Sequence, residues 1–185
     1  DLSGFDEAFW SHMAFVLSNG IRSFFLSIFN GRGSHVPSVP VGYLNFYYQQ
    51  LNLYSAKLAL MTDFTMLTMG GALKRHEKLS ARLGDLLSCL YLASAVLKNF
   101  HDDDYPEEDL PLIHWACQQL LFEAEEAVQG ILDNFSGVFQ RMILRVLVNP
   151  LSRRIKPPSD KLGLQVAKIL TRSHAARDRL ISDVF

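Results

Sequence analysis

Six histidines are the most obvious metal ligands in the chain, and a bundle of long helices with inward carboxylates can hold a di-iron centre. Such a centre needs a Glu-x-x-His pair, whose two side chains project from one face of a helix. No histidine here has a carboxylate three residues before it, where the chain carries Phe9, Arg32, Leu73, Lys98, Pro111 and Thr171. The sequence therefore excludes a di-iron site of this type.

A zinc site is the second metal chemistry to consider. His114 and Cys117 are spaced by about one helical turn, and Cys89 could supply a third ligand. No CxxC or HExxH pattern accompanies them, and no Gly-x-Ser-x-Gly motif indicates nucleophilic catalysis. We therefore expect both cysteines to be small buried hydrophobic residues and His114 to cap or line a helix bundle.

Asp63 is the one carboxylate in the most apolar stretch of the chain, residues 58–67. This stretch is apolar nearly all round a helix, which predicts a position at the centre of a bundle. A carboxylate there needs a cationic or hydrogen-bonding partner, and Arg82 and Lys57 are the candidates. We expect a structural ion pair rather than a catalytic role.

A basic and apolar stretch between Phe135 and Pro158 is the most informative feature for function. It carries five basic residues and no acidic one. An amphipathic basic helix with a wide apolar face lies in a membrane interface or docks on a partner, although the same face can pack on the protein's own bundle. The residues predicted to contact a membrane or partner are Phe139, Arg141, Ile143, Arg145, Arg153, Arg154 and Lys156.

The elements that position these residues show helical periodicity throughout, and no alternating segment typical of a strand occurs. The predicted fold is all-α: a bundle of long antiparallel helices with a shorter basic amphipathic C-terminal tail. Within one domain we expect three parts, which are an N-terminal helical segment with a Gly/Pro loop (1–42), a central bundle (43–135), and a basic tail with C-terminal helices (136–185). Long helices are predicted over 43–69, 77–100 and 110–135, and shorter ones over 137–148, 160–170 and the last residues.

Local signals predict where several of these helices bend or end. Gly20 divides residues 5–29 into two short helices or one bent helix. The glycine pair at 70–71 precedes basic residues without phosphate-loop spacing, and this indicates a helix break with a solvated basic turn. Ser159 and Ser173 are predicted N-caps.

Composition narrows the class of protein further. The length of 185 residues suits one domain, and a net charge of −1 argues against a general nucleic-acid binder. Two widely separated cysteines favour a reducing compartment.

The acidic first residues differ from the basic start of a secretory signal. Because the first residue is not Met, we interpret the chain as a piece of a longer polypeptide. We expect no apolar run of membrane-spanning length, since the best candidate, 13–29, is interrupted by polar residues.

Six stretches in the same order resemble the C-terminal domain of FadE-type bacterial acyl-CoA dehydrogenases, and together they extend over residues 43–185. They are 47–52 (YYQQLN), 70–85 (GGALKRHEKLSARLGD), 90–98 (LYLASAVLK), 109–116 (DLPLIHWA), 158–162 (PSDKL) and 176–180 (ARDRL). The resemblance implies a long flavoprotein of fatty-acid β-oxidation that converts acyl-CoA to trans-2-enoyl-CoA, with FAD as hydride acceptor and a glutamate as base. That chemistry would belong to the upstream dehydrogenase core. No catalytic, cofactor-binding or metal-binding residue is carried over to this segment, and no bound cofactor is expected in it.

The organisation also resembles the extra C-terminal helical domain of very-long-chain mitochondrial acyl-CoA dehydrogenases, which is associated with dimer contacts and inner-membrane attachment. The leading hypothesis is a structural domain that packs on the core, supports a homodimer, or attaches the enzyme to a membrane or an electron-transfer partner. The enzyme would then be cytoplasmic and peripheral on the inner membrane. A second hypothesis is a domain that shapes acyl-chain selectivity, and a third is a free-standing helical adaptor.

Overall fold

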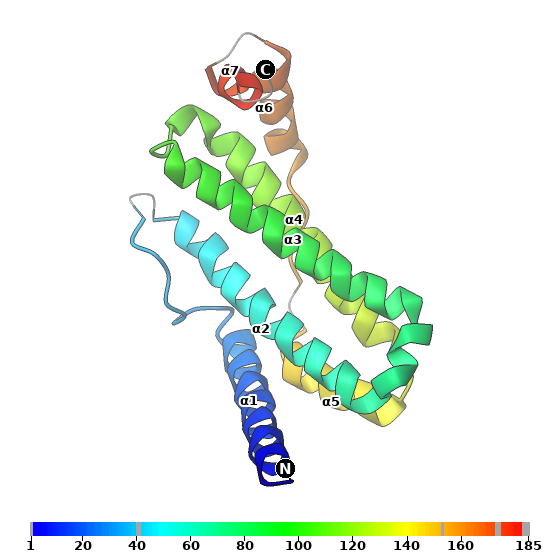
Figure 1. The fold of residues 1–185 in the computed structure, drawn as a ribbon. Helices are drawn as coiled ribbons and strands as arrows, with labels where there is room; N and C mark the ends of the chain where they lie inside the picture. Colours follow the sequence, from blue (N-terminus) through cyan, green and yellow to red (C-terminus); the bar gives the residue numbers. More distant parts are fainter. Residues whose placement is uncertain (1, 40–41, 153, 173–174, 183–185) are drawn as a thin grey trace.

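The computed structural model describes residues 2–39, 42–152, 154–172 and 175–182. Throughout these residues the chain forms α-helices and short 3₁₀ helices and no strand, so the predicted all-α fold is confirmed (Figure 1). The elements are α1 (Leu2–Ile28), α2 (Leu44–Met69), η1 (Gly70–Arg75), α3 (Glu77–Asp102), η2 (Glu107–Asp109), α4 (Leu110–Asn134), α5 (Val138–Val148), α6 (Asp160–Thr171) and α7 (Ala175–Ser182).

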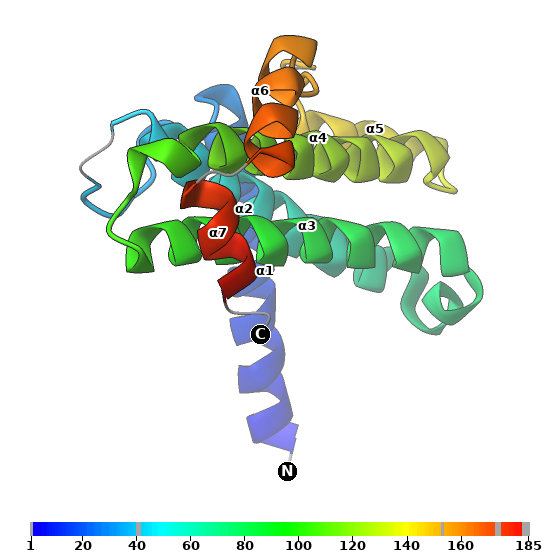
Figure 2. The ribbon, with the colours of Figure 1, turned by 90° about the horizontal axis from the view of Figure 1, so that it is seen from above.

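The centre of the molecule is an antiparallel pair, α3 and α4, with α2 packed beside it and α5 across one end (Figures 1 and 2). Buried side chains from these four helices form one hydrophobic core, which includes Leu60, Met61, Leu86, Leu97, Val128, Ile131, Leu144 and Val148. Because Leu144 and Val148 belong to α5, the first part of the predicted basic tail shares its core with the central bundle.

The predicted breaks and caps follow local chemistry. Helix α2 ends where Gly70 takes a φ of 51°, a left-handed conformation that glycine adopts without a steric cost. The side chain of Ser159 caps α6, because its Oγ accepts a hydrogen bond of 3.3 Å from the backbone N–H of Leu162. Ser173, the other predicted cap, lies outside the described residues.

The structure decides one local prediction and corrects another. Of the two alternatives for residues 5–29, the prediction of two short helices is wrong, because α1 is a single helix from Leu2 to Ile28 with Gly20 inside it, at its contact with Leu60 of α2. The second half of α2 is not buried all round, because Met66 and Leu67 are exposed. These residues belong to the last turn of α2, which leads into η1.

Helix α1 joins the bundle by only one of its ends. Its C-terminal half packs on α2 and α5, whereas its N-terminal half projects away from the other helices (Figures 1 and 2). The side chains of the projecting half are mostly exposed, including Trp10 at 68%. The position of α1 therefore leaves the N-terminal half of an apolar helix without a neighbouring helix within the described residues.

One helix of the described part, α3, is long and apolar enough to cross a membrane by length and composition alone. The best candidate expected from the sequence was 13–29, whereas α3 is the helix that meets this criterion, although polar residues such as Asp85 and Lys98 interrupt its apolar run. The helix packs along α4 and supplies seven buried residues, among them Leu86 and Leu97, as a core helix of a bundle does. Its outer face still carries apolar side chains, such as Leu87 and Leu92.

Candidate functional site

The residues predicted to contact a membrane or partner are divided between a helix and a following extended segment. On α5, Phe139 and Arg145 are exposed, whereas Arg141 and Ile143 are half-buried. Arg145 forms an ion pair of 2.5 Å with Asp133 at the end of α4. Arg154 and Lys156 belong to the segment between α5 and α6, and Arg153 lies outside the described residues.

Helix α5 has two apolar faces rather than one. Leu144 and Val148, spaced by four residues, are buried in the core. Val138, Met142 and Val146, also spaced by four, are exposed. Residues four apart share one face of a helix, so packing on the bundle uses one face and leaves a second apolar face in solvent.

A cavity of about 490 Å³ lies between the end of α1, the first half of α2, the middle of α4, and Asn149 and residues 154–156 of the segment between α5 and α6. Its polar lining includes three cationic residues, Lys57, Arg154 and Lys156. Apolar residues complete the wall, among them Leu53 and Leu121. Four separate segments assemble this cavity, and for this reason no motif in the sequence indicates it.

A buried ionic cluster lies behind the cavity, between α2 and α4. Glu125 is 1% exposed and Lys57 is 3% exposed. Glu125 accepts a hydrogen bond of 2.5 Å from the Tyr54 hydroxyl and one of 2.6 Å from the Gln129 side-chain amide. The Lys57 ammonium lies 3.9 Å from a Glu125 oxygen and 4.5 Å from the centre of the Tyr54 ring. Two hydrogen bonds and a nearby cation therefore compensate the buried carboxylate.

Burial dominates the protonation of this cluster. It lowers the pKa of the Lys57 ammonium, because an apolar surrounding disfavours the charged form, although the charge of Glu125 opposes the effect. The pKa of the Tyr54 hydroxyl lies well above its ordinary value of 10.0, first through burial and then through the adjacent Glu125 carboxylate. Tyr54 therefore stays a neutral hydrogen-bond donor to Glu125 at neutral pH.

The ion pair predicted for Asp63 is wrong. Lys57 pairs with Glu125, and the Arg82 side chain lies against Gly130 of α4. Asp63 is half-buried, and its Oδ2 atom has no hydrogen-bond partner among the described residues. The sequence did contain a signal for the real pair, because Lys57 and Glu125 each stand among the apolar positions of their helices, Lys57 between Tyr54 and Met61.

The residues considered for zinc have other neighbours. The Nδ1 atom of His114 lies 2.8 Å from the Tyr47 hydroxyl, so His114 lines the bundle as expected. Both cysteines are free and buried, and burial raises the pKa of the Cys117 thiol to about 12. The pKa of the Cys89 thiol is raised as well, by burial and then by the charge of Glu123. No group of three metal-ligating side chains occurs in the described part of the chain.

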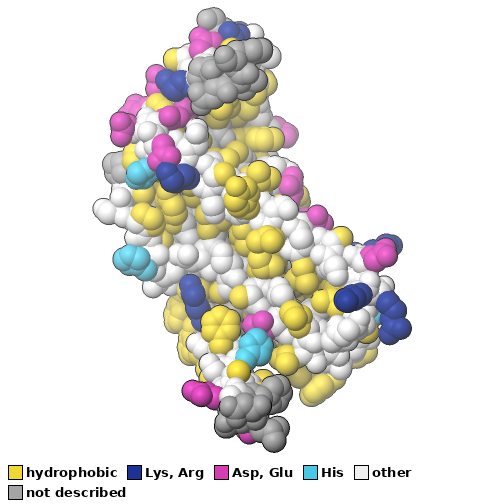
Figure 3. Space-filling view, viewed as in Figure 1, with side chains coloured by type: hydrophobic (Ala, Val, Ile, Leu, Met, Phe, Trp, Pro, Cys, Tyr) yellow, Lys and Arg dark blue, Asp and Glu magenta, His cyan; other side chains and the backbone are white. Residues whose placement is uncertain are grey.

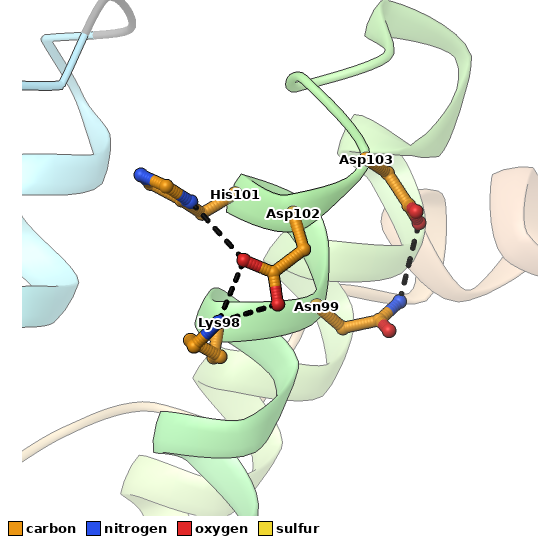
Figure 4. Close-up of polar contacts among 5 residues, drawn as sticks. All are labelled: Lys98, Asn99, His101, Asp102 and Asp103. Carbon is orange, nitrogen blue, oxygen red and sulfur yellow. Dashed lines mark hydrogen bonds and ion pairs between the residues drawn. The ribbon is translucent and has the colours of Figure 1, made fainter.

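A polar cluster at the C-terminal end of α3 is the most evident group of charged side chains (Figure 4). Lys98 donates to both oxygens of Asp102, at 2.6 and 2.5 Å, and His101 lies 3.3 Å from the same carboxylate. The side-chain amide of Asn99 donates a hydrogen bond to the carboxylate of Asp103, the residue after Asp102. The hydrogen bond from Lys98 is the main reason that the pKa of Asp102 is lowered. All these side chains are exposed, and the cluster stabilises a helix end rather than forming a His-Asp catalytic pair in a cleft.

A family model described as acyl-CoA dehydrogenase, C-terminal, bacterial type matches residues 1–185. The chain belongs to this family. The match includes the first 42 residues, for which the sequence motifs provided no resemblance. This acyl-CoA dehydrogenase C-terminal domain is thus part of an oxidoreductase, and no solved structure matches it.

The family implies FAD in the complete enzyme, and neither the glycine pair at 70–71 nor the cavity beside Lys57 has the features of a glycine-rich dinucleotide site. Dinucleotides are held by backbone N–H groups of a glycine-rich turn at the start of a helix. The adjacent pair Gly70 and Gly71 instead opens a 3₁₀ helix that buries no residue, and the cavity beside Lys57 has no glycine in its lining. We therefore derive no step of the dehydrogenation through residues of this domain.

Proposed function

We propose that this domain docks on the catalytic part of its own acyl-CoA dehydrogenase through α1, as a non-catalytic structural element. The observation that carries the proposal is the exposure of large apolar side chains on the projecting half of α1. Figure 3 shows one side of this half, on which hydrophobic side chains lie beside acidic ones and a histidine. An isolated amphipathic or apolar helix has little stability in water, and an exposed apolar surface of this length is typical of a contact site. The exposed large apolar residues of α1 are Phe9, Trp10, Phe15, Leu17, Ile21 and Phe25.

The charges on α1 favour a protein partner over a lipid surface. Anionic membranes attract helices whose polar positions carry Lys and Arg. The projecting half of α1 carries the carboxylates Asp6 and Glu7 and no Lys or Arg, since the first such residue of α1 is Arg22, in its C-terminal half. The other part of the same dehydrogenase is the partner that the family provides, and docking on it would bury the apolar side chains.

Under this proposal, FAD and the catalytic base act elsewhere in the polypeptide, where acyl-CoA is oxidised to trans-2-enoyl-CoA in fatty-acid β-oxidation. A general base must reach the substrate proton. The buried carboxylates among the described residues have other contacts, because Asp109 forms a 2.6 Å ion pair with Arg179 and Glu125 is enclosed by Tyr54 and Gln129. Their enclosure supports a structural role.

The exposed face of α5 supports a second candidate function, attachment to a membrane surface. Val138, Phe139 and Met142 are exposed beside Arg141 and Arg145, which is the arrangement of a helix that lies in a lipid interface. The enzyme would then be a cytoplasmic protein, peripheral on the inner membrane. The ion pair of Arg145 with a carboxylate of α4 reduces the free positive charge on this face, so we rank this function second.

Hydrogen exchange measured on the full-length dehydrogenase and on the 185-residue chain tests the docking. If α1 docks on the catalytic part, its amides exchange at least about tenfold more slowly in the full-length enzyme, a difference of about 1.4 kcal/mol in opening free energy. Replacing Trp10 and Leu17 by Glu should abolish this protection. The matched control is Leu164→Glu with Leu170→Glu, which places the same two charges at exposed apolar positions of α6 and should leave α1 protected.

Equal exchange of α1 in both proteins would contradict the docking. Repeating the measurement on the 185-residue chain with vesicles of anionic lipid separates the second function from the first. Protection of α5 that is lost at high salt would support membrane attachment, and unchanged exchange in α5 would rule it out.

A further inference from the structure

The cavity between α1, α2, α4 and segment 149–156 combines a buried cation with an apolar wall. Its volume of about 490 Å³ lies in the range of sites for small organic ligands, roughly 300–1,000 Å³. Its apolar lining comes from α2, α4 and the extended segment, through residues such as Phe46, Leu53, Leu121 and Ile155. The cavity does not involve the projecting half of α1, so its role is independent of the proposed docking.

Lys57 is the residue that points to the kind of ligand. Its ammonium group has three N–H donors, and among the described residues no acceptor lies within hydrogen-bond distance. The nearest carboxylate oxygen, on Glu125, is 3.9 Å away and already accepts the Tyr54 hydroxyl. Lys57 is 97% buried from solvent by the rest of the chain, yet it lines the cavity. A buried ammonium is costly without acceptors, and an anion in the cavity would supply them.

The extended segment brings two more cations to the same cavity. Arg154 and Lys156 both line it, and neither side chain forms an ion pair with a described residue. No Asp or Glu belongs to the lining. Gln118 of α4 holds the segment in place, because its side-chain amide donates to the backbone oxygens of Lys156 and Pro157, at 3.4 and 3.3 Å. Three cationic residues therefore belong to the lining of the cavity, and the one carboxylate near Lys57, that of Glu125, is not part of the lining.

We propose that this cavity binds a small organic anion, with a carboxylate or phosphate head against Lys57 and an apolar body along Leu53 and Leu121. Arg154 and Lys156 close the open side over the head group, since charge-assisted hydrogen bonds from Arg and Lys are the usual contacts of such anions. The buried Lys57 selects for charge, and the apolar wall selects for a hydrocarbon part. The site is thus a ligand-binding function separate from docking.

The test uses the 185-residue chain, whose core is formed by its own helices, and follows amide chemical shifts by NMR. The probes are hexanoate, hexyl phosphate, inorganic phosphate and uncharged hexanol. We expect saturable changes in the amide chemical shifts of residues 50–57 and 149–156 with hexanoate or hexyl phosphate. The probe that binds more tightly identifies the preferred head group. Inorganic phosphate and hexanol should each bind at least about tenfold more weakly, since each lacks one half of the recognised chemistry.

Two variants locate the binding. Lys57→Met should weaken it by about tenfold or more, because a charge-assisted hydrogen bond is lost. Arg154→Gln, at an exposed position that the fold does not need, should weaken it by about threefold or more and decides the question if Lys57→Met does not fold. Lys168→Met, an exposed lysine of α6, is the matched control and should bind like the parent chain. Absence of saturable shifts, equal binding of hexanol, or unchanged affinity in Arg154→Gln would overturn the proposal.

Discussion

The buried hydrogen bond between Tyr54 and Glu125 is expected to be a main source of stability in the bundle. Tyr54→Phe removes the hydroxyl that donates to the carboxylate at 2.5 Å and retains the ring. A hydrogen bond to a charged group contributes about 1.5–3 kcal/mol, and the acceptor here is 1% exposed, so water does not replace the lost donor. Glu125 keeps its 2.6 Å hydrogen bond from Gln129, which limits the damage.

We therefore expect Tyr54→Phe to lower the free energy of unfolding by about 2 kcal/mol, and Tm by about 4–8 °C for a chain of this size. Urea unfolding followed by circular dichroism at neutral pH measures the first quantity, and a thermal scan measures the second. Tyr91→Phe is the matched control, because Tyr91 is 72% exposed and its hydroxyl contacts no described residue. The control should change stability by less than about 0.5 kcal/mol. If both variants lower the free energy of unfolding by the same amount, the hydrogen bond between Tyr54 and Glu125 does not stabilise the fold.

Further predictions concern two glycines and a cysteine. Gly20→Ala should stabilise the chain by about 1 kcal/mol in urea unfolding, because the new Cβ would lie at an ordinary 3.7 Å from Leu60 and alanine favours the helix; a loss of stability would contradict this packing. Gly31→Ala should instead cost about 1–3 kcal/mol, since Gly31 has a φ of 75° and a Cβ there would lie 2.5 Å from the Gln49 carbonyl oxygen. Burial raises the pKa of the Cys117 thiol from its ordinary 9.0 to about 12. The thiol therefore ionises at a lower pH in the unfolded chain than in the folded chain, and the free energy of unfolding falls as the pH rises from 9.0 towards 12. Between pH 8 and 10 the free energy of unfolding of the parent chain should fall by about 1.4 kcal/mol more than that of Cys117→Ala, as measured by urea unfolding. The same pH dependence of the unfolding free energy in both proteins would refute the raised pKa of Cys117.

The helices and their ends could be predicted from the sequence because their causes are local. Apolar spacing indicated α2, α3 and α4, and hydrogen bonds between residues four apart make each helix depend on its own segment. Gly70 and Ser159 act on the backbone of their immediate neighbours, so both the helix break and the cap were confirmed. The motifs of residues 43–185 also indicated the family, which the match over the whole chain confirmed.

The partners of the buried charges could not be predicted in the same way. The apolar surroundings of Asp63 indicated an ion pair, but helical spacing does not tell which cation meets which carboxylate. Lys57 turned out to face Glu125 on α4, and Tyr54 reaches the same carboxylate across 71 positions of the chain. Asp63 stands at a partly exposed position, because the helices that contact α2, which are α1, α3, α4 and α5, do not cover every side of it.

The sequence by itself determined the all-α class, the approximate extent of α2, α3 and α4, and the absence of a zinc or di-iron motif. Only the tertiary structure decided that α1 projects from the bundle, that α5 exposes a second apolar face, and that Arg154 and Lys156 meet Lys57 at one cavity. The periodicity of a helix shows which side chains share a face, whereas the neighbour of that face depends on contacts between segments distant in the chain. Those contacts depend on how whole helices pack together, and no local pattern records them.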